Sequence, residues 1–200
     1  MGRTGFLILF LPFFMIPLVV GPLSAGEPTE KIKQTTEKLV AILSDEALKA
    51  PEKREEKKKM IREVVDERFD WEAFSRRSLG RHWKKMTEEE KKTFVSLFGE
   101  ILEKAYMARV GDYSGEKMSF EEEIVDGKYA LVLAKIMTEK YGEIPVKYRV
   151  RKRGDNWLIY DISVQGVSLV NNYRSQFNNI LMKSSPQELI KRLQEKLEKG

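Results

Sequence analysis

The sequence predicts an α+β domain in which helices pack on an antiparallel meander sheet of four to five strands. Apolar residues recur with the helical period of about 3.6 before residue 110 and after residue 168. Between Lys117 and Gln165 the period is two, which is typical of strands. Helices, then strands, then helices again indicate α+β architecture rather than alternating parallel-sheet units.

The first 25 residues have the pattern of a secretory signal peptide. One cation precedes an apolar run from 6 to 20, and small residues surround the expected cleavage point after Ala25. An uncleaved membrane anchor is the alternative interpretation of the same segment. Residues 26–200 are long enough to form a single domain with a core of its own.

The composition narrows the classes of site and partner. The chain has no cysteine, which excludes disulfides, thiolate metal sites and a cysteine nucleophile. Its 36 basic and 31 acidic residues are interspersed, as in EKREEKKK at 52–59. Mixed charge of this kind is typical of a solvated helix surface, so we expect no nucleic acid partner.

Four helices are expected before the sheet. Residues 29–48 carry a helical apolar stripe, and a second stripe follows Pro51. Asp70 is the expected N-cap of a short helix that ends at Gly80. A capping box of Thr87 and Glu90 then begins a long apolar helix, with Gly111 as its expected end.

Strand-like runs follow, joined by the turn signals Asp126-Gly127, Tyr141-Gly142-Glu143 and Gly154-Asp155. The runs cover 117–125, 128–138, 144–153 and 156–165. After them the helical period returns from Ser168 to Met182, and Ser185-Pro186 begins a last helix.

The faces of the strands indicate what covers the sheet. In the third strand, apolar residues alternate with Lys147, Arg149 and Arg151, so one face is expected to be covered and the other wet. The second strand is apolar on both faces, and one of them is rich in alanine. Such a face could help to enclose an apolar ligand, or could simply allow a helix to approach closely.

The sequence contains no recognisable catalytic, metal or cofactor motif. His82 is the only histidine and has no acidic neighbour in sequence, so we expect a structural or surface role. Asp161 lies between apolar residues, and we expect it to face solvent or to pair with Arg149 or Arg151. We therefore predict no catalytic residue, no metal site and no cofactor.

Polar residues crowd the stretch GVSLVNNYRSQF at 166–177. On a helix, Leu169, Tyr173 and Phe177 form one apolar stripe, and most of the polar residues fall on the opposite side. Ser168 is the expected N-cap. Tyr173 places a hydroxyl on the apolar stripe, where it needs a partner or the mouth of a pocket.

Two segments resemble the MlaC-like family, also called toluene-tolerance proteins. They are FDWEAFSRRSLGRHWKKMTEEEKKTFVSLFGEILEKAY at 69–106 and WLIYDISVQGVSLVNNYRSQF at 157–177. The likeness covers essentially the whole chain after residue 25, in order and length. Residues 29–68 are rich in lysine and resemble the family only in their pattern of residue types.

The resemblance implies a periplasmic carrier whose sheet and helices enclose an apolar cavity for phospholipid acyl tails. It also implies two partners, an outer-membrane lipoprotein complex and an inner-membrane ABC lipid transporter complex, between which the lipid passes. Relatives encoded beside hopanoid genes make another membrane lipid an alternative ligand.

From this resemblance and the strand and helix periods, we predict the residues that line the lipid cavity. Tyr173 and Phe177 come from the helix at 168–182. The others are Tyr106, Val132, Ala134, Val146, Tyr148, Val150, Leu158 and Tyr160.

Arginines beside an aromatic cluster are candidates for docking a partner. We predict this role for Arg76, Arg77 and Arg174, with an ordinary solvated face as the alternative. Two other functions remain open: a ligand-free adaptor that docks membrane complexes through its basic surface, and an enzyme that uses Asp161 or His82 as acid or base.

Overall fold

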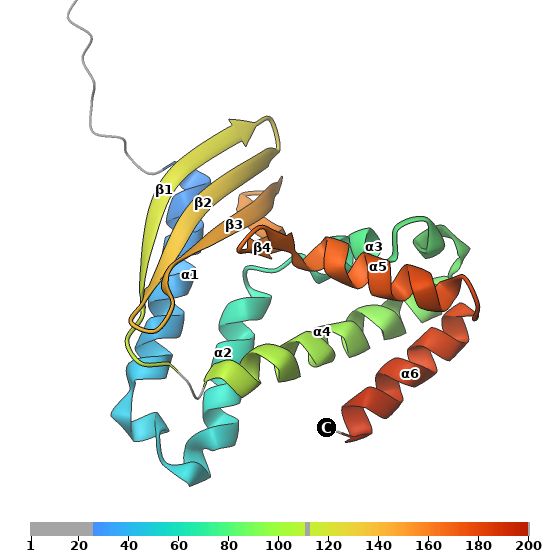
Figure 1. Cartoon of the computed structure of the whole chain (residues 1–200), viewed down its shortest axis with the longest axis horizontal. Helices are drawn as coiled ribbons and strands as arrows, with labels where there is room; N and C mark the ends of the chain where they lie inside the picture. Colours follow the sequence, from blue (N-terminus) through green and yellow to red (C-terminus); the bar gives the residue numbers. More distant parts are fainter. Residues whose placement is uncertain (1–25, 111–112, 200) are drawn as a thin grey trace, which may run out of the picture.

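The computed structural model describes residues 26–110 and 113–199. The expected signal peptide and the expected helix end at Gly111 lie outside these residues. Figure 1 shows helix α1 beside the sheet on one side of the molecule and the helices α5 and α6 on the other.

The helices confirm the expected order. Before the sheet they are α1 (Glu27–Ser44), α2 (Arg54–Asp66), α3 (Trp71–Leu79) and α4 (Glu88–Val110). Short 3-10 turns at Glu46–Leu48, Pro51–Lys53 and Gly80–Lys85 connect them. After the sheet come α5 (Leu169–Leu181) and α6 (Pro186–Lys199).

Helices α3 and α4 begin at the residues that their cap chemistry predicts. The Asp70 carboxylate accepts a hydrogen bond from the Ala73 amide, 2.9 Å away, at the start of α3. In the capping box, the Thr87 hydroxyl accepts from the Glu90 amide while the Glu90 carboxylate accepts from the Thr87 amide. Helix α3 ends at Gly80, whose φ of +55° is available to glycine at little cost.

The sheet is an antiparallel meander with the strand order β1-β2-β3-β4-β5. A bulge interrupts the β1–β2 pairing near Phe120, and another interrupts β3–β4 next to Arg149. The strands are β1 (Lys117–Asp126), β2 (Tyr129–Thr138), β3 (Gly142–Arg153), β4 (Asn156–Val164) and the two-residue β5 (Val167–Ser168).

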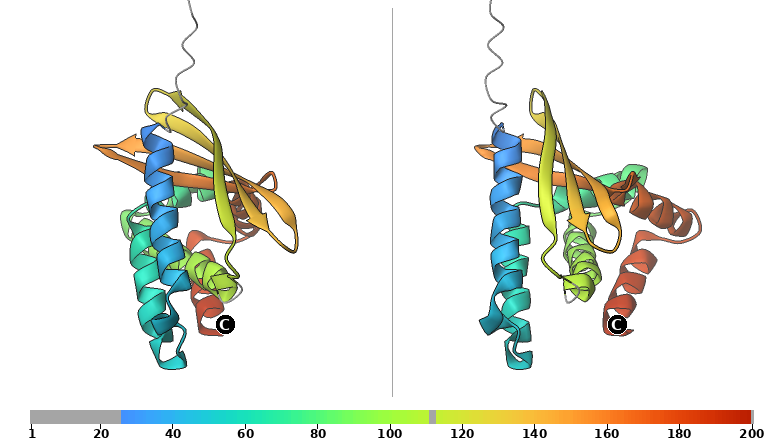
Figure 2. Two further views of the ribbon diagram at one scale, coloured as in Figure 1. Left: turned by 90° about the vertical axis from the view of Figure 1, so that its left-hand side faces the viewer. Right: turned by 60° about the vertical axis from the view of Figure 1, so that its left-hand side comes forward.

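Helix α1 lies across one face of the sheet, which we call the inner face (Figure 2). Ile32 of α1 packs there against buried strand residues, among them Val132 and Val150. The opposite, outer face carries Lys147, Arg149 and other polar side chains of β3. The expected division of β3 into a covered face and a wet face is therefore confirmed.

The buried apolar residues form three clusters. The sheet core lies on the inner face, and the hairpin core lies between the paired helices α1 and α2. The helical core joins α3, α4, α5 and α6 around the rings of Phe74, Phe94, Phe98 and Phe177. Phe69, between α2 and α3, packs against all three clusters.

Backbone pairing holds Phe69 in this position. The Asp70 amide donates to the Ile159 carbonyl, and the Ile159 amide donates to the Arg68 carbonyl, both at 2.8 Å. The buried Arg68 guanidinium donates to the Thr35 hydroxyl in α1 and to the Trp157 carbonyl in β4. Residues 68–70 therefore tie α1, α3 and the sheet to one another.

None of the helices in the described ranges has the length and apolar character needed to cross a membrane.

Replacing Phe69 by alanine should lower the free energy of unfolding by about 3 kcal/mol, because the cavity it leaves adjoins all three cores. Urea denaturation followed by circular dichroism measures this change. The control is Phe120→Ala, which removes an equally large, partly buried ring from the sheet core alone. An equal loss in both variants would contradict the linking role of Phe69.

Candidate functional site

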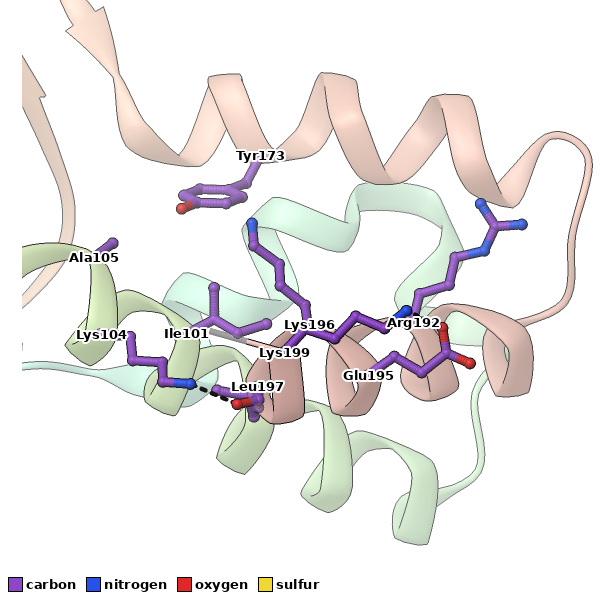
Figure 3. A pocket seen from close by; sticks show the side chains of 9 residues that line it. All are labelled: Ile101, Lys104, Ala105, Tyr173, Arg192, Glu195, Lys196, Leu197 and Lys199. Atoms are coloured by element: carbon purple, nitrogen blue, oxygen red, sulfur yellow. Dashed lines mark hydrogen bonds and ion pairs between the residues drawn. The ribbon is translucent and has the colours of Figure 1, made fainter.

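Helices α4, α5 and α6 surround a pocket of about 610 Å³, which we call the helical pocket (Figure 3). Its apolar floor consists of Ile101 and Ala105 from α4, Tyr173 from α5 and Leu197 from α6. Its remaining lining is charged and consists of Lys104, Arg192, Glu195, Lys196 and Lys199.

Helical spacing explains how these residues come together. Ile101 and Ala105 are four positions apart on α4, so they share a face. On α6, Arg192, Lys196 and Lys199 recur at intervals of four and three and also share a face. The Lys104 ammonium donates to the Leu197 carbonyl and so joins α4 to α6 across the pocket.

Tyr173 connects the pocket to the helical core. Its ring makes an edge contact with Phe98, at 4.8 Å between centroids, and stacks on Phe177 at 5.7 Å. Burial raises the pKa of the Tyr173 hydroxyl above its usual range, because the charged phenolate would lose its hydration. The interpretation of 166–177 as an apolar stripe backed by polar residues is thus confirmed, and Tyr173 lies at a pocket.

The other predicted lining residues occupy separate places. Phe177 is buried in the helical core behind Tyr173. Tyr106 packs against the hairpin core. Five strand residues share the inner face of the sheet and are buried in the sheet core: Val132, Ala134, Val146, Tyr148 and Val150.

Leu158 and Tyr160 do not share that inner face. Leu158 pairs with Arg151, which lies on the outer face. Tyr160 makes an edge contact with the outer-face residue Tyr129, and the Arg77 guanidinium lies 4.1 Å from the Tyr160 ring. The expectation that these two residues line the same wall as Val150 is wrong, because the β-bulge in β4 shifts the alternation of its side chains.

The buried tyrosines of the two other cores have little polar contact. The Tyr148 hydroxyl lies 3.7 Å from the Met118 sulfur, and burial raises the pKa of Tyr148 well above its usual range. Burial beside Glu103 likewise raises the pKa of Tyr106. The Tyr106 hydroxyl is buried and makes no hydrogen bond within the described part of the chain.

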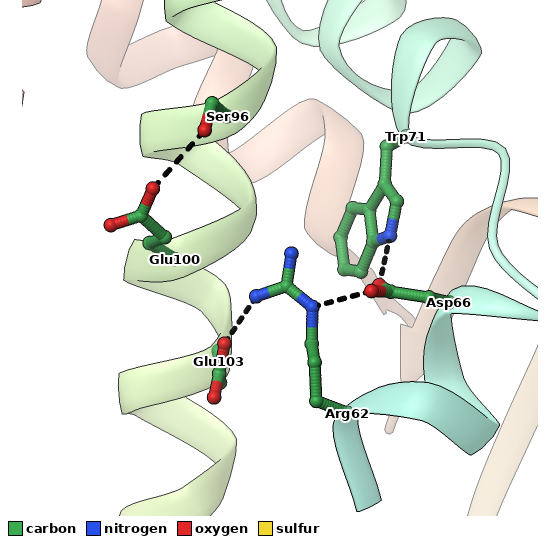
Figure 4. Close-up of polar contacts among 6 residues, drawn as sticks. All are labelled: Arg62, Asp66, Trp71, Ser96, Glu100 and Glu103. Carbon is green, nitrogen blue, oxygen red and sulfur yellow. Dashed lines mark hydrogen bonds and ion pairs between the residues drawn. The ribbon is translucent and has the colours of Figure 1, made fainter. Parts of the chain in front are cut away.

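Beside Tyr106, a polar network joins α2 to its neighbours (Figure 4). The Arg62 guanidinium donates to Asp66 at 2.7 Å and also pairs with Glu103 of α4. The second oxygen of Asp66 accepts from the Trp71 indole nitrogen, also at 2.7 Å. This network holds α2 against the start of α3 and against α4.

A second pocket, of about 540 Å³, lies between Gly80 and α5 and contains one of the three predicted docking arginines. Arg174 lines this pocket and donates from Nε to the Arg77 carbonyl at 2.8 Å. Arg77 is half-buried against Tyr160, whereas Arg76 is exposed. His82 is buried at the same place, 3.1 Å from the Asn178 side chain, which agrees with a structural role.

The buried Asp161 also has structural partners. Its carboxylate accepts from the Ser168 hydroxyl at 2.7 Å, from the Val170 amide at 3.1 Å and from Arg149 at 3.2 Å. Of the two expected roles, pairing with Arg149 is confirmed and exposure to solvent is wrong. Among residues 26–110 and 113–199, no group of acidic and histidine side chains is arranged to hold a metal ion.

Comparison with known proteins identifies the family. Residues 33–195 match the family model described as MlaC protein. The chain belongs to the MlaC family.

One curated protein and one solved structure are similar to this chain. The intermembrane phospholipid transport system binding protein MlaC of Haemophilus influenzae is 27% identical over 123 residues, which is 58% of this chain and 57% of the relative. The match thus spans little more than half the length of that curated relative. A phospholipid-binding protein from Ralstonia solanacearum, solved in complex with a phospholipid, has the same fold, with a TM-score of 0.75 at 20% identity over 87% of this chain and 98% of that one.

Within this MlaC-family chain, sequence reasoning missed the charged lining of the helical pocket. The one available signal was the recurrence of cations at 192, 196 and 199 on one face of α6. That pattern is also found on ordinary solvated helices, so it does not by itself indicate a pocket.

Asp161→Asn tests the structural role of this carboxylate. Because an amide can no longer accept from all three partners, we expect the free energy of unfolding to fall by about 2 kcal/mol. Asp126→Asn, at the exposed end of β1, should change it by less than about 0.5 kcal/mol. A stable Asp161→Asn protein would contradict the role that we assign to this network.

Proposed function

We propose that this protein is a carrier that binds a phospholipid and moves it between membranes. The observation that carries the proposal is the helical pocket, which combines an apolar floor with an exposed, charged mouth. Its volume of about 610 Å³ is in the range of small-molecule sites, ~300–1,000 Å³. Membership of the MlaC family, and relatives whose names refer to phospholipid binding or transport, support it.

The energetics of a carrier favour an apolar pocket with few polar contacts. Moving two acyl tails of roughly 16 carbons out of water gains about 25 kcal/mol, which is more than noncovalent binding delivers. A carrier takes its lipid from a bilayer, however, so the pocket only has to match hydrocarbon and shield the tails from water. In the helical pocket the floor residues Ile101, Ala105, Tyr173 and Leu197 provide the apolar part of such an environment.

We place the first contact of the tails on the floor of the helical pocket, at Tyr173 and Ile101, with Phe177 behind them. The inner-face residues Val132, Ala134, Val146, Tyr148 and Val150 form a second apolar wall, but α1 covers them. A tail reaches that wall, and Tyr106 beside the hairpin core, only after α1 or α2 moves away. We leave Leu158 and Tyr160 out of the site because they lie on the outer face.

Within this proposal the protein is exported to the periplasm and residues 1–25 are its signal peptide. It exchanges lipid with an outer-membrane lipoprotein complex and an inner-membrane ABC lipid transporter complex. Arg76 and Arg174 are the proposed docking residues, since both are exposed and Arg174 lines the second pocket. The Arg77 carbonyl holds Arg174 in place by accepting a hydrogen bond from its Nε.

Protein purified without detergent should contain phospholipid at close to one molecule per chain, as measured by solvent extraction and mass spectrometry. Ala105→Trp should lower this occupancy by about tenfold, because a large ring at an exposed position of α4 would fill a pocket of ordinary ligand size. The control is Ser96→Trp, at an exposed position of α4 outside the pocket. Absence of lipid from the wild-type protein in repeated preparations would refute the proposal.

A carrier should also accelerate the movement of a fluorescent phospholipid from donor to acceptor vesicles, with Ala105→Trp much slower than Ser96→Trp. The rate should rise in proportion to protein concentration, because each molecule carries its own cargo. If the wild-type protein holds lipid but does not accelerate transfer, the chain is a lipid-bound adaptor rather than a carrier.

A further inference from the structure

The helical pocket has an apolar part and a charged part, and the binding of acyl tails requires only the apolar part. Its floor is apolar, but four cations stand around it: Lys104, Arg192, Lys196 and Lys199, which we call the cationic rim (Figure 3). Among the described lining residues only Glu195 is acidic. Apolar acyl tails make no favourable contacts with charged side chains. The cationic rim is therefore suited to the headgroup of the ligand.

The acidic residues near the cationic rim neutralise its positive charge only in part. Arg192 pairs with Glu188 at 3.0 Å, one turn away on α6. Glu195 lies 3.9 Å from the Lys199 ammonium and 4.0 Å from that of Lys191, at the outer limit of an ion pair. By contrast, Lys53, just before α2, and Lys58, within α2, each contact a glutamate at 2.6 Å. The rim therefore keeps positive charge at the pocket mouth.

Stabilisation of the helix end does not account for the whole rim. Cations in the last turn of α6 interact favourably with the helix dipole, which gives Lys196 and Lys199 a structural role. Arg192 lies earlier in α6, and Lys104 belongs to α4 on the other side of the pocket. Cations from two helices therefore line one pocket, although the Lys104 ammonium is also held by the Leu197 carbonyl.

We infer that the cationic rim binds the phosphate of phospholipids that carry a net negative charge, and so makes the carrier prefer anionic over zwitterionic headgroups. Lysine and arginine both bind phosphate oxygens through charge-assisted hydrogen bonds. A zwitterionic headgroup brings its own cation to the same mouth, and the repulsion of that cation offsets part of the attraction of its phosphate. The inference rests on the proposed function, because the tails must occupy the apolar floor beneath.

Delipidated protein is equilibrated with vesicles of equimolar phosphatidylglycerol and phosphatidylcholine, reisolated free of vesicles, and its bound lipids are quantified by mass spectrometry. Exposed charge pairs of modest strength should make the ratio of bound phosphatidylglycerol to bound phosphatidylcholine about fivefold higher than the ratio in the vesicle, and we call this factor the enrichment. The enrichment should decline as sodium chloride is added, because salt screens the exposed rim.

In the Lys196→Gln/Lys199→Gln variant the enrichment, which is a ratio of the two bound lipids and so does not depend on total uptake, should fall close to one. The matched control, Lys84→Gln/Lys85→Gln, removes the same charge from exposed positions outside the pocket and should keep the wild-type enrichment. An equal loss in both variants would overturn the inference in favour of a general effect of basic charge.

Two further outcomes separate this inference from the proposed function. If the wild-type protein takes up both lipids in the vesicle ratio, the headgroup preference is wrong and the carrier function stands. If it takes up neither lipid, the carrier function itself is wrong. Stabilisation by inorganic phosphate that depends on Lys196 and Lys199, without lipid enrichment, would show a site for the free anion and would overturn the inference.

Discussion

The short segment from Arg68 to Asp70 is the constraint on which the rest of the structure depends. Its backbone pairs with Ile159 of β4, and its central side chain, Phe69, enters all three apolar clusters. Asp70 caps α3 and pairs with Arg151 from the outer face of the sheet. Since an unpaired buried carboxylate is costly, this arrangement fixes the direction in which α3 leaves the sheet. The position of the helical layer, and with it the helical pocket, follows from that direction.

A second junction, at Asp161, attaches the other side of the helical layer. The carboxylate joins Arg149 of β3 to Ser168 and to the first turn of α5. Ser168 in turn caps α5 by accepting from the Asn171 amide. A buried acid that resembled a catalytic candidate in the sequence thus sets where α5 begins, and so where Tyr173 meets α4.

The distribution of polar groups agrees with a ligand held by its hydrocarbon. The sheet core and the helical core contain aromatic and aliphatic side chains, while the charges of the helical pocket stand at its mouth. An apolar floor exchanges lipid with a bilayer at little net cost, whereas exposed charges contribute modest energies that adjust preference. Affinity and selectivity are in this way assigned to different parts of one pocket.

The sequence by itself determined the order of helices and strands, the turns and the caps at Asp70, Thr87 and Ser168, because these depend on local periods and on neighbours within one turn. It also predicted Tyr173 as the unusual member of an apolar stripe. The tertiary structure alone decided which predicted lining residues come together. The bulge beside Arg149 moves Leu158 and Tyr160 to the outer face, and α1 covers the inner face. The cationic rim was equally hidden, since it forms only where α4 and α6, far apart in the chain, pack side by side.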